Sequence, residues 1–347
     1  MPKPPLSTTL IHHPYRPPDG FVAPQPGVFK ASTVIFPNVA ALHARDWKQR
    51  SGYTYGLHGT PTTFLLEERI ATLEGGLQTL LLPSGLAAIT LVDAALLAAG
   101  DEVLIPDNAY GPCRELARQE LQRWGIGHRL YDPSDPGALA AMIGPATRLL
   151  WLEAPGSITM EFPDLPALVR AARAHGVTTV LDNTWGAGVA FDPFDLDSGG
   201  EGGLGVDISV HALTKFPSGG GDVLMGAVTT RDEALHLRLK ATHMRMGFGV
   251  GANDVEAVLH ALPSLALRYA AQDAAGRTLA RWWAEQPQAG AVLHPALPGS
   301  PGHDHWARLC TQAAGLFSVL FDERHPPAQV HAFCDALRLF KIGYSWA

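Results

Sequence analysis

The sequence predicts an α/β fold in which a mostly parallel central sheet carries helices on both faces, followed by a smaller α+β domain. From about residue 77 onward, short apolar runs alternate with segments of helical pattern, which is typical of a parallel sheet. Leu165, Leu168, Val169 and Ala172 recur at helical spacing, so this segment has one apolar face to lay on a sheet. With 347 residues, 46% of them hydrophobic, the chain can bury one large core and a smaller one.

Three regions follow one another along the chain. Residues 1–50 are rich in proline, which fixes φ and removes a backbone donor, so we expect an N-terminal arm without regular elements. Residues 51–235 contain the apolar runs TLLLP, EVLIPD, RLLWLEAP and VTTVLDN and are the predicted ligand-binding α/β domain. Residues 236–347 combine helical patterns with the strand-like run FSVLFD, which predicts the α+β domain.

Composition excludes several classes of protein. The formal net charge of −7 is the wrong sign for a nucleic-acid-binding surface. No apolar run reaches the roughly 18 residues of a membrane span, and the first residues lack an apolar signal core, so we expect a cytoplasmic protein with no membrane partner. The three cysteines lie far apart, and the pair His303 and His305 lacks further ligands, so no metal site is predicted.

Lys215 is the lysine best placed for chemistry. It follows the apolar run DISVHALT and precedes FPSGGGD, so a strand delivers it to a Gly-rich loop at the mouth of a sheet, where α/β proteins bind ligands. An amine that is partly desolvated there has a lowered pKa and can form a Schiff base with an aldehyde. The alternative is a lysine that only extends its ammonium group from a strand end into water.

Asp182 ends the apolar run VTTVL, so its side chain can reach the same edge as Lys215. A Schiff-base lysine that uses pyridoxal phosphate needs such a carboxylate, because a protonated pyridine nitrogen makes the ring an electron sink. Asp182 taken alone is equally consistent with a helix cap or a turn residue.

A turn for the cofactor phosphate follows the run TLLLP. There, Gly85 and Leu86 open a long Ala- and Leu-rich helix, whose first amides and dipole favour an anion. Thr214, beside the lysine, adds a hydroxyl donor, although it is also an ordinary β-branched strand residue. Tyr110 follows the run EVLIP and is a candidate for stacking on the pyridine ring, or else a half-buried loop tyrosine.

These residues occur in an order that resembles the Cys/Met-metabolism family of fold-type I pyridoxal-phosphate enzymes, over nearly the whole chain. The motifs that carry the resemblance are YTYGLHGTPT with Tyr55, LPSGLAA with Gly85, DNAYGP with Tyr110, LDNTW with Asp182 and ALTKFPSGGGDVLMG with Lys215. The resemblance implies that Tyr55 reaches the phosphate and substrate of a neighbouring subunit. It therefore implies a homo-oligomer with a dimeric active site, commonly a tetramer, in which the Pro-rich arm clasps the neighbour.

Three positions resemble the β-lyases of the family rather than its γ-type members. Gly156-Ser157 stands where γ-type members usually have Thr-Asn, Trp185 stands where they have phenylalanine, and Trp346 stands where they have leucine. The resemblance thus implies a carbon–sulfur lyase of methionine biosynthesis that cleaves cystathionine, a small sulfur amino acid, to homocysteine, pyruvate and ammonia. A γ-lyase or γ-synthase is the alternative within the family.

The resemblance also implies the role of each residue. Lys215 removes the Cα proton, Asp182 holds the protonated pyridine, and Tyr110 stacks on the ring and assists proton transfer. Ser345 lies near the substrate α-carboxylate and Trp346 shapes the substrate pocket.

The sequence departs from the family at two internal positions and at its end. Leu57 replaces an arginine that binds the phosphate, and we expect His58 to take over part of its role. Ala212 replaces a serine three residues before the lysine. The family continues beyond the YSW motif with an arginine that orients the substrate carboxylate, so we expect an incomplete α+β domain. The alternative of another class is therefore a cofactor-binding but catalytically silent subunit.

Overall fold

The computed structural model describes residues 5–14, 18–21, 23–48, 52–197 and 203–346. Seven strands form the main sheet: β1 (Gln78–Leu82), β2 (Glu102–Pro106), β3 (Gly127–Tyr131), β4 (Thr147–Glu153), β5 (Thr178–Asp182), β6 (Ile208–His211) and β7 (Gly226–Thr230). Two more form a separate ribbon: β8 (Ala289–Leu293) and β9 (Ser318–Phe321).

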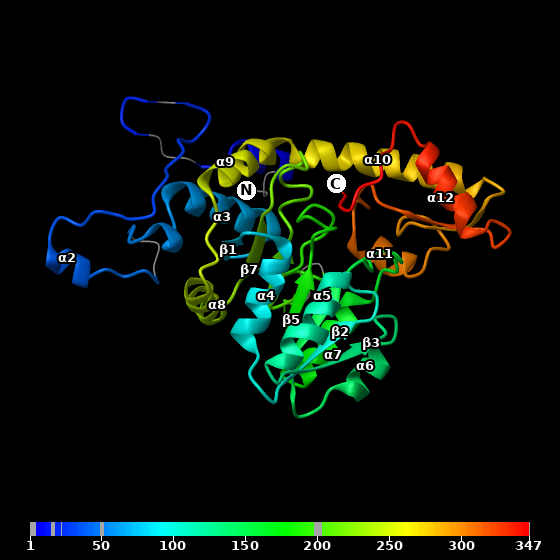
Figure 1. Ribbon diagram of the computed structural model, residues 1–347, viewed down its shortest axis with the longest axis horizontal. Helices are drawn as coiled ribbons and strands as arrows, with labels where there is room; N and C mark the ends of the chain where they lie inside the picture. Colours follow the sequence, from blue (N-terminus) through cyan, green and yellow to red (C-terminus); the bar gives the residue numbers. More distant parts are fainter. Residues whose placement is uncertain (1–4, 15–17, 22, 49–51, 198–202, 347) are drawn as a thin grey trace.

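The helices of the first 200 residues are α1 (Leu6–Ile11), α2 (Val39–His43), η1 (Gly56–His58), α3 (Pro61–Glu74), α4 (Gly85–Leu96), α5 (Gly111–Leu116), η2 (Ala117–Leu121), α6 (Pro136–Met142) and α7 (Leu165–Ala174). The later ones are α8 (Glu233–Met246), α9 (Ala252–Ala261), η3 (Leu262–Ser264), α10 (Leu265–Ala284), α11 (His303–Leu309) and α12 (Pro327–Ala336). Figure 1 shows the sheet at the centre, the arm with α2 projecting at one end, and the β8–β9 ribbon with α12 at the other.

The sheet has the order β1-β7-β6-β5-β4-β2-β3. All neighbours are parallel except that β7 runs antiparallel to both β1 and β6. Because β7 reverses direction between these two, β1 points the same way as the other five strands. The prediction of a mostly parallel sheet is confirmed, and the carboxyl ends of six strands meet at one edge.

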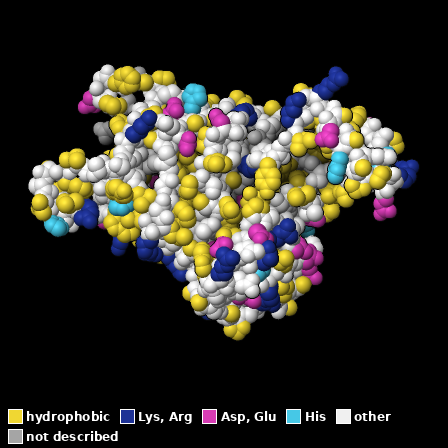
Figure 2. All heavy atoms as spheres, in the orientation of Figure 1, with side chains coloured by type: hydrophobic (Ala, Val, Ile, Leu, Met, Phe, Trp, Pro, Cys, Tyr) yellow, Lys and Arg dark blue, Asp and Glu magenta, His cyan; other side chains and the backbone are white. Residues whose placement is uncertain are grey.

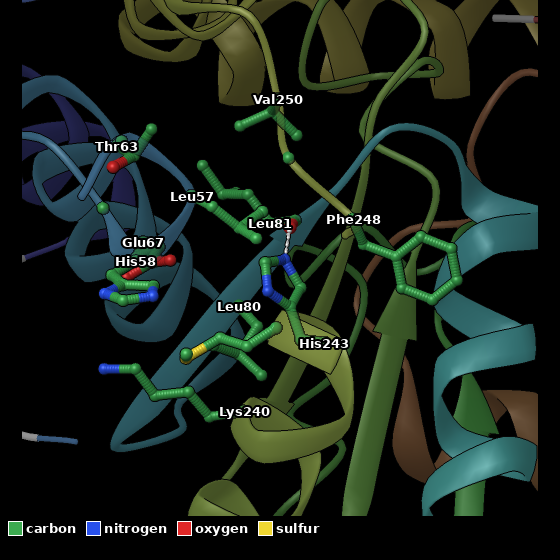
Figure 3. A pocket seen from close by; sticks show the side chains of 14 residues that line it. Leu57, His58, Thr63, Glu67, Leu80, Leu81, Lys240, His243, Phe248 and Val250 are labelled. Atoms are coloured by element: carbon green, nitrogen blue, oxygen red, sulfur yellow. Dashed lines mark hydrogen bonds between the residues drawn. The ribbon is translucent and has the colours of Figure 1, made fainter. Parts of the chain in front are cut away.

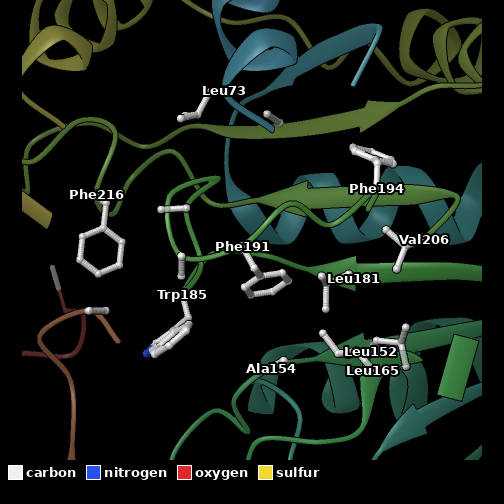
Figure 4. Packing of buried hydrophobic residues seen from close by; sticks show 14 of the residues in the cluster. Leu73, Leu152, Ala154, Leu165, Leu181, Trp185, Phe191, Phe194, Val206 and Phe216 are labelled. Atoms are coloured by element: carbon white, nitrogen blue, oxygen red, sulfur yellow. The ribbon is translucent and has the colours of Figure 1, made fainter. Parts of the chain in front are cut away.

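Apolar side chains alternate between the two faces of the sheet, as the pleat requires. Leu150, Leu152 and Leu181 enter one buried cluster together with α7, while Trp151 and Val180 enter a second cluster with α4. Figure 4 shows the first cluster, in which aromatic rings from the loops pack against these strand residues. The apolar face predicted for α7 is confirmed, since all four residues of the pattern are buried.

The arm differs from the expectation that its prolines block regular elements. Two short helices form there, α1 and α2, and the prolines flank them or lie in the connecting segments. Helix α1 packs against α3, η3 and α10, and its Leu10 is buried. A proline just before a helix costs no hydrogen bond, because the first turn has free amides in any case. Helix α1 is therefore tied to the body of the protein, whereas α2 has no buried residue.

A carboxyl group is enclosed in the second cluster. Asp93 of α4 is only 2% exposed, and its Oδ1 accepts a 2.9 Å hydrogen bond from Trp151 Nε1 of β4. Burial raises the pKa of Asp93 to about 7, against the weaker opposing effect of the Trp151 bond. The folded protein thus favours the neutral carboxyl of Asp93. The stability that comes from this preference is complete below pH 4 and is lost as the pH rises through 7.

We predict that Asp93→Asn stabilises the apoprotein at pH 8 and has little effect near pH 4. The amide oxygen still accepts from Trp151, while the cost of burying a charge above pH 7 disappears, a gain of roughly 4 kcal/mol. Denaturant unfolding at pH 8 and near pH 4 measures the change in the free energy of unfolding. Asp304→Asn, at an exposed position, is the control. An equal effect of Asp93→Asn at both values would contradict the prediction.

Candidate active site

The candidate site lies where the parallel strands end. The turn after β1, the loop after β2 and the last residues of β4, β5 and β6 all reach the same edge of the sheet. This is the edge at which open α/β sheets bind ligands. The residues predicted from separate sequence motifs, Gly85, Tyr110, Asp182 and Lys215, therefore share one edge.

Lys215 lies in a tight turn four residues beyond β6. Its amide donates to Ala212 O at 3.0 Å, and its own carbonyl accepts from Gly219 N at 3.0 Å. The Lys215 amine donates a hydrogen bond to Ser345 Oγ and lies 4.6 Å from the centre of the Trp346 ring. Partial burial lowers the pKa of Lys215, while the nearby Asp182 opposes this effect. The amine is thus biased toward its neutral, proton-accepting form.

Helix α10 holds the loop that follows Lys215. Arg268 Nη1 donates to Phe216 O at 2.7 Å. A Cβ at Gly219, whose φ is +64°, would lie 2.3 Å from Arg268 Nη1, so another residue would strain the backbone and displace this guanidinium group. The Phe216 ring is fully buried, with its centre 4.9 Å from that of Tyr269 and 5.7 Å from that of Trp346. The tail residue Trp346 is therefore packed against the same loop that carries the lysine.

Asp182 ends β5 on the face of the sheet that α4 covers. Its Oδ1 accepts from Thr184 N at 3.0 Å, and Thr184 Oγ1 in turn accepts from Ala212 N at 2.9 Å. Burial raises the pKa of Asp182, and the hydrogen bonds from Thr184 oppose this rise. A carboxylate in such surroundings is stabilised by a positively charged partner brought to it.

Helix α4 presents its amino end to this edge. The Ser84 side chain caps the helix by accepting from Ala87 N at 3.0 Å, and the first backbone bond is donated by Ala88 N to Ser84 O. The amides of Gly85 and Leu86 come before that bond and are available to an anion. A Cβ at Gly85 would lie 2.7 Å from the Ala212 Cβ, so the glycine lets the phosphate turn approach the turn of Lys215.

Thr214 is more constrained than its sequence position indicates. Its hydroxyl donates to Met225 O at 3.2 Å and accepts from Met225 N at 3.0 Å. Donation to a phosphate requires exchange of the first of these bonds, so the phosphate role of Thr214 stays a prediction.

Glu153 is a site residue that the sequence reasoning missed. It ends β4 directly beside Asp182 in the parallel register, and its Oε2 accepts from Tyr110 N at 2.7 Å. Burial raises the pKa of Glu153 well above its usual range, and the charge of Asp182 adds to this effect. The signal was present in the run RLLWLEAP, because a charged residue that ends an apolar strand reaches the same edge as Asp182.

Tyr55 and His58 lie elsewhere in this chain. Tyr55 is 45% exposed and borders a cavity of about 630 Å³ that is also lined by Lys30 and the start of α9. His58 shares a hydrogen bond of 2.7 Å with Thr54 Oγ1 and lines a smaller pocket with Lys240 (Figure 3). Burial lowers the pKa of His58, followed by the charges of Lys240 and Arg45. Neither cavity includes Lys215, Asp182 or Tyr110 in its lining.

The described residues show neither an arrangement for a metal ion nor a membrane-spanning helix. No group of three or more His, Cys, Asp or Glu side chains in residues 5–14, 18–21, 23–48, 52–197 and 203–346 is arranged to hold a metal ion. Over the same residues, no helix has the length and apolar character needed to cross a membrane.

Comparison with known proteins identifies the family. The family model described as "Cys/Met metabolism PLP-dependent enzyme" matches residues 7–347. The chain belongs to this family. A cystathionine β-lyase of Bordetella avium is 36% identical over 97% of this chain and 84% of its own length. The crystal structure of metB from Corynebacterium glutamicum superposes with a TM-score of 0.90 at 26% identity, covering 99% of this chain and 84% of that one.

Proteins that are named for other reactions also resemble the chain. The structure of a cystathionine γ-lyase from Lactobacillus plantarum in complex with L-serine gives a TM-score of 0.88 at 25% identity, over 98% of this chain and 84% of that one. An L-alanine/L-glutamate racemase of Wolbachia pipientis is 31% identical over 92% of this chain and 79% of its own length. The family, the fold and the cofactor are thus established. The relatives are named for different reactions, so similarity alone does not identify the reaction of this chain.

The cofactor of this family is pyridoxal phosphate, and the edge of the sheet fits it. Lys215 would hold the aldehyde carbon, since its amine is biased toward the neutral form. Asp182 would hold the pyridine nitrogen, because burial favours a positive partner for its carboxylate. The amides of Gly85 and Leu86 would hold the phosphate at the start of α4.

We predict that Gly85→Ala weakens cofactor binding about tenfold or more, because the added methyl group overlaps the Ala212 Cβ and separates the two turns. The double variant Gly85→Ala/Ala212→Gly should recover most of the affinity, since the Ala212 Cα at 3.3 Å then becomes the nearest atom. Absorbance titration of each apoprotein with the cofactor measures this, with Ala212→Gly alone as the control. Unchanged affinity in Gly85→Ala would refute the assignment.

Proposed function

We propose that this chain is a carbon–sulfur β-lyase that cleaves L-cystathionine to homocysteine, pyruvate and ammonia. The observation that carries the proposal is the position of the Trp346 ring, 4.6 Å from the Lys215 amine. An indole at this distance closes one side of the space above the lysine and leaves an apolar wall for a thioether chain. The Bordetella avium relative is named for the same activity, which supports the proposal.

Lys215 is the proposed acid and base. Its lowered pKa favours the neutral amine, which accepts the proton from Cα of the substrate. The hydrogen bond to Ser345 Oγ and the contact with the Trp346 ring hold the amine in place before the substrate arrives. Once Lys215 has taken up the proton, the Ser345 hydroxyl and the face of the Trp346 ring support the ammonium group on Nζ.

Asp182 and Tyr110 are the proposed supports of the cofactor ring. When bound, the cofactor provides a protonated pyridine ring that accepts the electron pair left by the Cα–H bond. Asp182 keeps that nitrogen protonated through its charge, and Thr184 keeps the carboxylate oriented. Tyr110 is 40% exposed at the same edge, where its ring can stack on a planar ligand.

The elimination balances without an oxidant or reductant. In the net reaction, the electron pair released from the Cα–H bond becomes the double bond between Cα and Cβ, and the Cβ–S bond breaks with its electrons on sulfur. The proton held by Lys215 offsets the charge of the departing homocysteine thiolate. The 2-aminoacrylate that is released takes up water and yields pyruvate and ammonia. Production of homocysteine agrees with a role in methionine biosynthesis.

We also propose that the active site is completed by a second copy of the chain. Tyr55 and His58 lie apart from Lys215 in one subunit, and both border open pockets. The arm carries exposed apolar side chains, among them Ile35 at 85% and Val39 at 67% exposure. Figure 2 shows hydrophobic side chains at the left end, where α2 projects in Figure 1. Apolar groups so exposed gain stability when a partner covers them.

The reaction is tested with purified holoenzyme and L-cystathionine. We expect pyruvate and homocysteine in equal amounts, and no turnover in Lys215→Ala. The appearance of 2-oxobutyrate and cysteine would replace the proposal with a γ-lyase. Racemisation of L-alanine without lysis of cystathionine would place the chain with the racemase relative instead.

Mixing two inactive variants tests the shared site. In Tyr55→Ala the lysine is intact, and in Lys215→Ala the tyrosine is intact, so a mixed oligomer contains a complete site only if Tyr55 serves its neighbour. We expect activity well above that of either parent after the two chains are co-expressed. Parent-level activity in an oligomer shown to contain both chains would contradict the proposal.

A further inference from the structure

The ends of β4 and β5 bring two carboxyl groups side by side. Glu153 and Asp182 are the last residues of adjacent parallel strands and pair with each other in the register. Both lie on the face that Trp151 and Val180 share with α4, because side chains alternate along each strand. One of the two, Asp182, has a proposed task at the pyridine nitrogen, whereas Glu153 has none so far.

Glu153 is bonded to the loop that carries Tyr110. Its Oε2 accepts from the Tyr110 amide at 2.7 Å, directly at the residue that is proposed to stack on the cofactor. Tyr110 is the residue before α5, with φ −43° and ψ 120°, so a bond to its amide fixes where the helix begins and where the ring points. Because a strand end is rigid, the bond holds the Tyr110 backbone at a fixed position relative to β4.

The same loop is joined to the segment after β4 by further contacts. Ser157 N donates to Asn108 O at 2.9 Å, and Asn108 Nδ2 donates to Glu161 Oε2 at 3.1 Å. A Cβ at Gly156 would lie 2.2 Å from Asn108 Nδ2, so this glycine allows the two segments to touch. Glu153 is the member of this group of contacts that reaches Tyr110 itself.

The electrostatic setting of Glu153 favours an oxygen acceptor over a negative charge. Burial raises its pKa well above the usual range, the adjacent Asp182 adds to the rise, and the Tyr110 amide, Ser157 and Arg114 oppose it. A neutral carboxyl beside Asp182 avoids placing two like charges at neighbouring strand ends. The neutral group still has a carbonyl oxygen that accepts from the Tyr110 amide.

We propose that Glu153 is a positioning residue that holds the Tyr110 backbone and thereby sets the ring of Tyr110 over the cofactor position defined by Asp182 and Lys215. The contact acts through an oxygen at a fixed distance from the strand end. It does not require a charge on Glu153. The inference rests on the stacking role of Tyr110 proposed above.

Two substitutions separate distance from charge. Glu153→Gln keeps an oxygen at the same reach and removes the ionisable group. Glu153→Asp keeps a carboxyl group but withdraws it by one methylene, so the bond to Tyr110 N is lost. Both changes are small enough to preserve the strand, and thermal unfolding of the apoproteins verifies this.

The readouts are the cofactor dissociation constant and the visible circular dichroism of the bound cofactor, which reports the tilt of its ring. We expect the cofactor dissociation constant of Glu153→Gln to stay within about threefold of that of the unaltered protein. We expect Glu153→Asp to weaken binding about tenfold and to change the ellipticity. Glu161→Asp is the matched control, because it shortens a carboxyl on the same group of contacts that reaches Asn108 and not Tyr110.

Three outcomes would overturn the inference: Glu153→Asp behaving as the unaltered protein, Glu153→Gln being impaired as strongly as Glu153→Asp, or Glu161→Asp producing the same change. Tyr110→Ala distinguishes failure of the stacking role from failure of this inference. If Tyr110→Ala leaves the ellipticity unchanged, the stacking role itself is wrong. If it alters the ellipticity while Glu153→Asp does not, only the role of Glu153 is wrong.

Discussion

The geometry of the site depends on one reversed strand. Strand β7 lies between β1 and β6 and runs against both, so β1 ends at the same edge as the strands that carry Asp182 and the lysine turn. The start of β7 is held close to the phosphate turn, since a Cβ at Gly226 would lie 2.3 Å from Ser84 O. Because β7 starts at the edge where β6 ends, the connection of residues 212–225 that carries Lys215 stays at this edge. The reversal therefore keeps the lysine turn beside the anion-binding end of α4.

A buried polar cluster fixes the other side of this edge. The carboxylate of Glu74, at the end of α3, accepts from His211 Nδ1 at 2.7 Å, Ser209 Oγ at 2.8 Å and Asn183 Nδ2 at 2.9 Å. The side chains of Glu74 and His211 are 0% and 1% exposed. Removing one member of such a cluster leaves a buried group unpaired, at a cost of about 3–5 kcal/mol. Since Asn183 follows Asp182 directly, this cluster also limits movement of the proposed pyridine partner.

Much of the edge was predictable because each residue follows an apolar run. Gly85, Tyr110, Asp182 and Lys215 all come within a few residues of a buried strand, and parallel strands deliver their ends to a common place. Glu153, which ends β4, follows the same rule and was not predicted. The Met225 partner of Thr214 was not predictable, since it joins residues eleven apart through a loop whose path depends on β7. The helices of the arm were missed because proline terminates helices without preventing their start at the next residue.

The two ends of the lysine turn are supported by different parts of the chain, and this has a chemical consequence. Arg268 of α10 holds the backbone at Phe216, while Ser345 and Trp346 of the tail contact the amine itself. The backbone contact is partly buried and holds the loop, whereas the tail contacts involve the amine that would take up the proton. A substrate that enters above Lys215 would therefore meet a base on a well-supported backbone and an apolar wall supplied by the tail. Asp182 and the start of α4 lie on rigid elements and would hold the cofactor. Selectivity between sulfur substrates is therefore expected to reside in the tail at Trp346 and in the loop at Trp185, which share the apolar cluster around Phe216.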